Sequence, residues 1–135
     1  MVDGENTFTD QNLPFFGFSR LIWVRQQHPV RVDNMLYLSG QVGNIPGTWN
    51  LVPGGVVPET RQILENIKAI LESHNSSLDR VVKCTVFMVD INEWPKMNEV
   101  YRTYFSANPP ARSAVAGSGL ALNARVEIEC IAVVN

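Results

Sequence analysis

The chain has 135 residues, of which 45% are apolar and 18% are charged, with a net charge of −2 and a pI near 5.6. This is the size of a single domain with its own core, and it lacks the basic excess with which nucleic-acid-binding proteins neutralise phosphates, so we do not expect a nucleic-acid partner. No window is long and apolar enough to span a membrane, and residues 1–13 have no signal-peptide pattern, so we expect a cytoplasmic protein.

The cysteine and histidine residues do not form a metal-binding pattern. Cys84 and Cys130 lie in apolar runs rich in β-branched residues, which favours burial as small apolar side chains. The chain has no CxxC motif, and His28 and His74 are distant in sequence from each other and from both cysteines. We therefore expect no zinc site.

The first part of the chain predicts two short strands joined by a turn, followed by a loop. The strands are expected at Pro29–Val32 and Met35–Gln41, with the turn at Asp33-Asn34. Residues 43–58 contain four Gly and three Pro and are therefore predicted to be a loop. Residues 1–28 fit no single element.

The central part predicts a helix and then a strand. Glu59–His74 has apolar residues at the spacing of one helical face, namely Ile63, Leu64, Ile67, Ile70 and Leu71. Arg80–Asp90 is predicted to be a strand, and its apolar residues on both faces suggest a sheet that is covered on both sides.

A second helix and two further strands follow. Asn92 is the expected N-cap, and Pro95 is tolerated in the first helical turn. Pro109-Pro110 ends the helix. Extended chain is expected at Ser113–Val115, and the last strand at Arg125–Val134.

This order of elements predicts one α+β domain over residues 1–135, with a mixed β-sheet and two helices packed on one face. The other face of the sheet would still carry apolar side chains. We therefore expect this face to be covered by another copy of the chain.

Two loops contain residues suited to ligand binding. The glycines of Ser39–Gly43 allow a tight turn that a small ligand could approach, although such a turn also occurs without any ligand. In residues 109–113, two prolines precede Arg112, whose planar guanidinium can bind a carboxylate through two hydrogen bonds. The alternative for Arg112 is a surface or interface salt bridge.

The last strand carries alternating charges. Arg125, Glu127 and Glu129 are spaced two apart and would share one face. Either Arg125 forms a lateral salt bridge with one of these glutamates, or one glutamate acts as a general acid or base.

Three segments together resemble the Rid family (reactive intermediate deaminase, also called YjgF or L-PSP endoribonuclease). They are LYLSGQVG at 36–43, VVKCTVFMVDINEWPKMNEVYRTYF at 81–105, and PPARSAV with RVEIECIAV within 109–133. The resemblance implies a chorismate-mutase-like fold and a homotrimer with clefts between subunits. It also implies hydrolysis of 2-imino or enamine acids to 2-keto acids and ammonia, with no cofactor and no metal.

The resemblance also implies roles for individual residues. Arg112 would hold the carboxylate of the small-molecule substrate, and Glu127 would position or activate the water that adds to the imine carbon. Ser39 and Asn98 match positions that line or support the pocket, and Gly40 matches the tight turn beside it.

Some positions differ from the family pattern. Gln26 stands where the family has a pocket Tyr, and Ala114 stands where it often has Cys, so both would belong to the pocket wall. Residues 1–28 form a longer and more aromatic N-terminal segment than usual. These differences leave two alternatives open, an enzyme for another imine or carbonyl substrate in a biosynthetic pathway, or a non-catalytic trimer that binds a small ligand.

Overall fold

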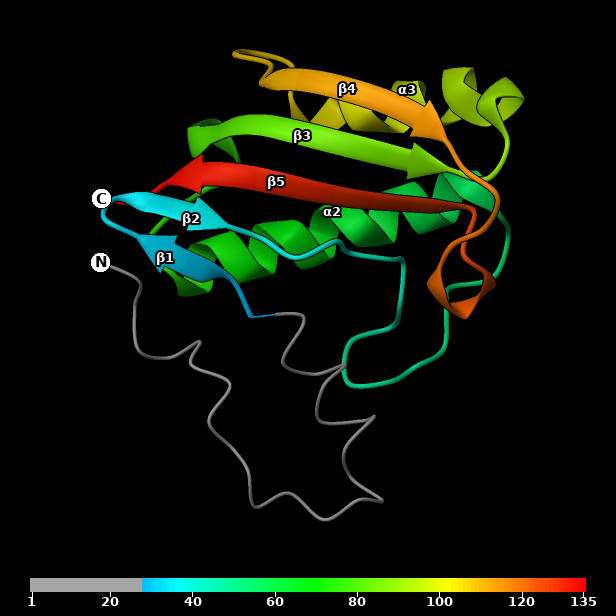
Figure 1. Ribbon diagram of the computed structural model, residues 1–135, viewed down its shortest axis with the longest axis horizontal. Coiled ribbons are helices and arrows are strands. Elements are labelled where there is room, and N and C mark those ends of the chain that lie inside the picture. Colours follow the sequence, from blue (N-terminus) through cyan, green and yellow to red (C-terminus); the bar gives the residue numbers. More distant parts are fainter. Residues whose placement is uncertain (1–27) are drawn as a thin grey trace.

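The computed structural model describes residues 28–135, which build a sheet with two helices on one face (Figure 1). Elements are labelled as in Figure 1. The strands are β1 Val30–Val32, β2 Met35–Tyr37, β3 Val81–Met88, β4 Ala111–Ala116 and β5 Val126–Val133. The helices are α2 Val56–Ser73 and α3 Trp94–Tyr104. Short 3-10 turns occupy Leu78–Arg80, Ile91–Glu93 and Ala121–Asn123.

The sheet is mixed, with the strand order β1-β2-β5-β3-β4. β3 and β4 run parallel, and the other neighbouring pairs are antiparallel. Both helices lie behind the sheet in Figure 1, so the predicted α+β architecture with helices on one face is confirmed.

The core lies between the sheet and the helices. β5 alternates between buried and less buried residues, and its buried residues are Val126, Ile128, Cys130 and Ala132, followed after the strand by the buried Val134. α2 contributes its apolar face, in which Ile63, Leu64 and Ile67 are fully buried. Cys84 and Cys130 are free thiols inside this core, as expected.

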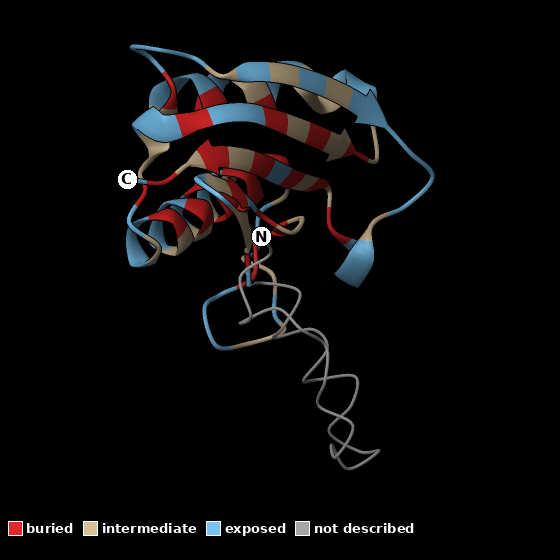
Figure 2. Ribbon diagram, turned by 60° about the vertical axis from the view of Figure 1, so that its left-hand side comes forward, coloured by how far each residue is buried: buried red, intermediate tan, exposed pale blue. Residues whose placement is uncertain are grey.

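The helix-free face of the sheet is open in the single chain. The prediction that β3 is covered on both sides is therefore wrong for one copy, because Thr85 and Phe87 on this face are only half-buried. Tyr37 and Val115 point to the same side and are 42% and 50% exposed. Figure 2 shows this alternation of buried and exposed bands along the strands.

Helix α2 begins at Val56, three residues before the predicted start at Glu59. Pro58 lies in the first turn, where backbone N–H groups have no partner within the helix and the missing proton of proline costs nothing. Gly54 and Gly55 precede the helix with positive φ angles of 112° and 88°, which suit glycine. Among residues 28–135, neither helix is both long and apolar enough to cross a membrane.

The predicted N-cap of the second helix is wrong. Asn92 lies inside the 3-10 turn Ile91–Glu93, and its backbone N–H donates to Asp90 Oδ1 at 2.9 Å, so Asp90 caps that turn. The α-helix begins only at Trp94, with Pro95 in its first turn as expected.

Candidate active site

Arg112 is the best-defined cationic group of the candidate site. It lies near the start of β4, and its Nη1 donates to Asn98 Oδ1 at 2.7 Å. Its Cζ atom is 4.6 Å from the ring centroid of Tyr101 and 5.2 Å from that of Trp94. Cation–π contacts on two rings and one hydrogen bond fix the guanidinium while leaving most of its five N–H donors available.

The salt-bridge alternative for Arg112 does not hold within the part of the chain that the structure describes. Among residues 28–135, no carboxylate forms an ion pair with its guanidinium. Arg112 instead borders a cavity of about 360 Å³ at the end of α3. The other lining residues are Asn98, Tyr101, Arg102, Phe105, Pro109 and Pro110. The cavity therefore has a cationic wall and an apolar wall, a combination suited to a small carboxylate-bearing molecule.

Ser39 and Gly40 form a bulge next to β5. Tyr37 pairs with Ile131 and Gln41 pairs with Ile128. The segment from Tyr37 to Gln41 is therefore one residue longer than the stretch of β5 that it faces. The predicted strand therefore ends at Tyr37 and resumes only as a bridge at Gln41. A bulge of this kind re-aims backbone and side chains at the edge of a regular ladder.

The bulge brings Gly40 against the side chain of Glu127. A Cβ atom at Gly40 would lie only 2.8 Å from Glu127 Oε2 and 2.9 Å from its Cδ, so a larger residue would displace the carboxyl group from this position. Ser39 lies half-buried beside this contact, and its carbonyl oxygen accepts a hydrogen bond from Gln41 Nε2 at 3.1 Å. Glycine at position 40 thus allows the close approach of the Glu127 carboxyl group.

The ionisation of Glu127 is shifted by its surroundings. Burial raises the pKa of its carboxyl above the ordinary value of 4.5, and the nearby charge of Glu129 raises it further. Both glutamates lie on the helix-free face, because Glu127 pairs with Phe87 and Glu129 pairs with Thr85. When it is ionised, a carboxylate with a raised pKa is a stronger proton acceptor than an ordinary glutamate.

The two predicted catalytic residues lie on opposite faces of the sheet. Arg112 pairs laterally with Cys84, and Ala114 pairs with Val86, so both face the helices together with these core residues. Glu127 faces the other way. One chain therefore presents two separate half-sites, one with Arg112, Asn98 and Ala114, the other with Glu127, Gly40 and Ser39.

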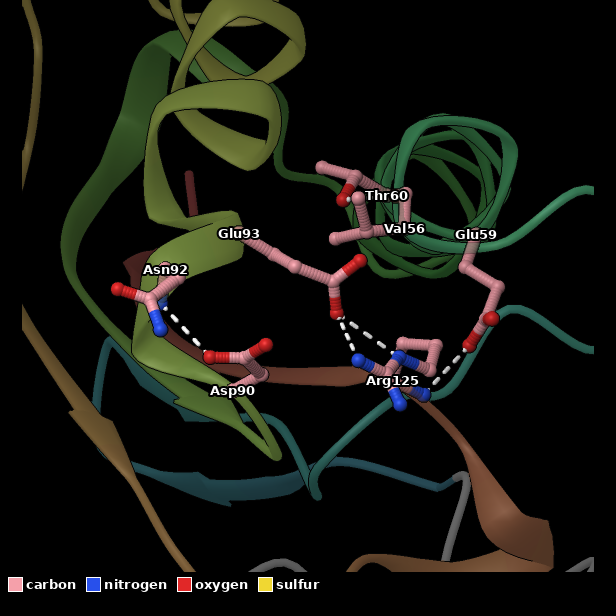
Figure 3. A network of polar contacts seen from close by, with 7 residues as sticks. All are labelled: Val56, Glu59, Thr60, Asp90, Asn92, Glu93 and Arg125. Carbon is pink, nitrogen blue, oxygen red and sulfur yellow. Dashed lines mark hydrogen bonds and ion pairs between the residues drawn. The ribbon is translucent and has the colours of Figure 1, made fainter.

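The lateral salt bridge of Arg125 with Glu127 or Glu129, one of the two alternatives for the last strand, does not form. Its Nε donates to Glu93 Oε1 at 2.8 Å, and its Nη2 forms an ion pair with the same oxygen (Figure 3). Its backbone N–H donates to Glu59 Oε1 at 2.9 Å. The pKa of the Glu59 carboxyl is raised, chiefly by burial. This network ties the start of β5 to both helical regions, and among residues 28–135 no arginine forms an ion pair with Glu127.

Sequence reasoning missed two residues of the Arg112 half-site, Trp94 and Arg102. Both are four residues from Asn98 along α3, so they share one helix face with it. That spacing was the available signal. Gln26 lies outside the described residues, and His28 is exposed. Within residues 28–135, no group of three or more His, Cys, Asp or Glu side chains is placed to hold a metal ion.

Comparison with known proteins shows which family the chain is related to. The family model for endoribonuclease L-PSP matches residues 24–134. The 2-iminobutanoate/2-iminopropanoate deaminase of Mus musculus is 47% identical over 104 residues, which cover 77% of this chain and 77% of that protein.

Solved structures give the same result. The Yersinia pestis protein YyfA, described as a conserved Rid protein of unknown function, has a TM-score of 0.76 and 40% identity, over 79% of this chain and 86% of that one. Escherichia coli TdcF with bound serine has a TM-score of 0.74 and 34% identity, over 82% of this chain and 95% of that one. The chain therefore belongs to the Rid family, also described as the endoribonuclease L-PSP family.

Proposed function

We propose that this chain is a Rid-type enzyme that hydrolyses 2-imino acids to 2-keto acids and ammonia. The observation that carries the proposal is Arg112, which is fixed in a small cavity and has no carboxylate partner among the described residues. A relative at 47% identity is named as an imine deaminase, and the related TdcF binds serine, which has the carboxylate and the nitrogen of such a substrate.

The reaction needs only orientation and one acid–base group. A water oxygen adds to the imine carbon, the carbon–nitrogen bond then breaks, and ammonia leaves while the carbonyl forms. Arg112 binds the substrate carboxylate, and the Glu127 carboxylate accepts the proton of the attacking water and passes it to the departing nitrogen. A protonated imine is already electrophilic, so no activated nucleophile from the protein is required.

We further propose that the site is assembled between subunits of a homotrimer. Arg112 and Glu127 face opposite sides of one sheet, so a substrate can touch both only if a second chain supplies one of them. The open face, with half-exposed Tyr37 and Val115, supports burial against another copy. Ser39 and Gly40 would accompany Glu127, and Asn98 and Ala114 would accompany Arg112.

A trapping assay tests the activity. An amino-acid oxidase generates the 2-imino acid in the presence of semicarbazide, and semicarbazone formation measures how much imine escapes hydrolysis. We expect the wild type to suppress trapping and Arg112→Ala to lower kcat/KM by about tenfold to a hundredfold, the range for a lost charged hydrogen bond. Lys68→Ala removes an exposed charge on α2 and serves as the matched control.

The alternative is a family member with another substrate or with binding alone. It rests on Ala114 and Gln26, which replace the Cys and Tyr of the family pattern. Failure of the wild type to suppress trapping with several imino acids would refute the deaminase proposal. Binding of 2-keto acids that disappears in Arg112→Ala would then favour the binding protein.

A further inference from the structure

Arg102 is a second cationic side chain at the cavity that holds Arg112. It lies on α3 one helical turn after Asn98, the residue that accepts a hydrogen bond from Arg112. Arg102 and Arg112 both line the same cavity of about 360 Å³. Strand β4 and helix α3 thus each bring one guanidinium group to the same cavity, that of Arg112 held in place and that of Arg102 exposed.

The two arginines have different surroundings. Arg112 rests on the rings of Tyr101 and Trp94 and is held by Asn98. Arg102, in contrast, has no hydrogen-bond or ion-pair partner within the described part of the chain, and none of the residues that line the cavity is acidic. Two positive charges around one cavity create a field that favours an anion with more than one negative group.

We propose that the preferred substrates are 2-imino acids whose side chain ends in a second anionic group, a 2-imino dicarboxylate being the simplest. This inference rests on the proposed imine hydrolysis. The carboxylate next to the imine carbon binds Arg112, and the distal carboxylate binds Arg102. Phe105, Pro109 and Pro110 line the same cavity and would contact the methylene groups between the two carboxylates.

The chemistry of hydrolysis is unchanged by the second carboxylate. Water still adds to the imine carbon, and ammonia still leaves, while the distal carboxylate takes no part in bond making. Arg102 is therefore a specificity-determining residue, and its contribution should appear mainly in KM. An arginine that is exposed to solvent and does not contact the substrate would not distinguish substrates by charge.

The test compares 2-iminoglutarate with 2-iminobutanoate, each generated in place by an amino-acid oxidase. For each protein the measured quantity is the ratio of kcat/KM for the dicarboxylate to that for the monocarboxylate. We expect Arg102→Gln to lower this ratio about two- to fivefold, as the loss of an exposed charge pair would, and Arg102→Lys to restore part of it. Lys96→Gln removes an exposed charge from the same helix away from the cavity and should leave the ratio unchanged.

Salt gives an independent readout. Raising the ionic strength should reduce the dicarboxylate preference of the wild type and have little effect on that of Arg102→Gln, since screening acts on the charge that the variant lacks. If the wild type hydrolyses 2-iminobutanoate but wild type and Arg102→Gln have the same ratio of kcat/KM for the two imines, the inference is overturned and the proposed function stands. If the wild type hydrolyses neither imine, both the inference about Arg102 and the proposed function fail.

Discussion

The proposed reaction depends on the ionisation state of the Glu127 carboxyl group. It must be a carboxylate when it accepts a proton from water. Burial and the charge of Glu129 both raise its pKa above 4.5, so the carboxylate is lost at a higher pH than for an ordinary glutamate. The rate should therefore decline as the pH falls through this raised pKa.

Replacing Glu129 with Gln tests this account of the pKa. The variant removes a negative charge on the same face of β5, so the pKa of Glu127 should fall and the acidic limb of the profile of kcat/KM against pH should move to lower pH. Glu127→Gln should abolish most of the activity at every pH. An acidic limb that stays in place, or moves upward, in Glu129→Gln would assign the limb to another group.

Single residues also show how far sequence reasoning reaches into the site. The motif Pro-Pro-Ala-Arg-Ser indicates Arg112, and the family resemblance adds Asn98, Gly40 and Glu127. The structure supplies a physical reason for two of these positions, the hydrogen bond of Asn98 and the close approach of Gly40. Arg102 belongs to no motif, and its spacing of four residues from Asn98 is the sequence signal for its place beside Arg112.

At the scale of elements, hydrophobic periodicity predicts helices and strands better than it predicts their ends. The spacing of the apolar residues of α2 predicts the helix but not its first turn. That turn contains Pro58 and begins after two glycines with positive φ. A 3-10 turn capped by Asp90 comes before α3 and includes Asn92, so the α-helix begins only at Trp94. Such local competition between polar side chains is not visible in periodicity.

Gly43 holds the loop against the first turn of α2. A Cβ atom there would lie 2.8 Å from the carbonyl oxygen of Glu59 and 2.9 Å from its Cα, and this helical backbone cannot move aside cheaply. We expect Gly43→Ala to lower the free energy of unfolding by about 1–3 kcal/mol, as overpacking does. Chemical denaturation monitored by circular dichroism measures this change.

Gly117→Ala is the matched control for that measurement. No heavy atom lies within 4 Å of its added Cβ, and Gly117 does not have a positive φ. Its effect should stay within about 0.5 kcal/mol, like that of most surface substitutions. Equal destabilisation by the two variants would mean that the contact with Glu59 does not restrict residue 43.

At the scale of the whole molecule, the sheet decides which residues a single chain can bring together. The sequence predicts the sheet and its covered face, because apolar residues alternate along β5. It does not predict that Arg112 and Glu127 point apart. That outcome depends on the lateral pairing of Cys84 with Arg112 and of Phe87 with Glu127, and strand register is set by contacts distant in sequence.

If the site forms between chains, two inactive variants should complement each other. Arg112→Ala chains retain Glu127, and Glu127→Ala chains retain Arg112. When equal amounts are unfolded and refolded together, about a quarter of the interfaces of a cyclic oligomer should join the two intact residues, since each interface needs the two kinds of chain in one order. We expect about a quarter of the wild-type imine-hydrolysing activity to return.

The control for complementation is the same two proteins mixed without unfolding, in which chains that do not exchange remain inactive. Native mass spectrometry establishes that the refolded sample contains mixed oligomers. If mixed oligomers form and stay inactive, Arg112 and Glu127 do not meet across an interface. In that case the opposite orientation of the two side chains in one sheet would exclude a shared site, and the proposed role of one of them would have to be abandoned.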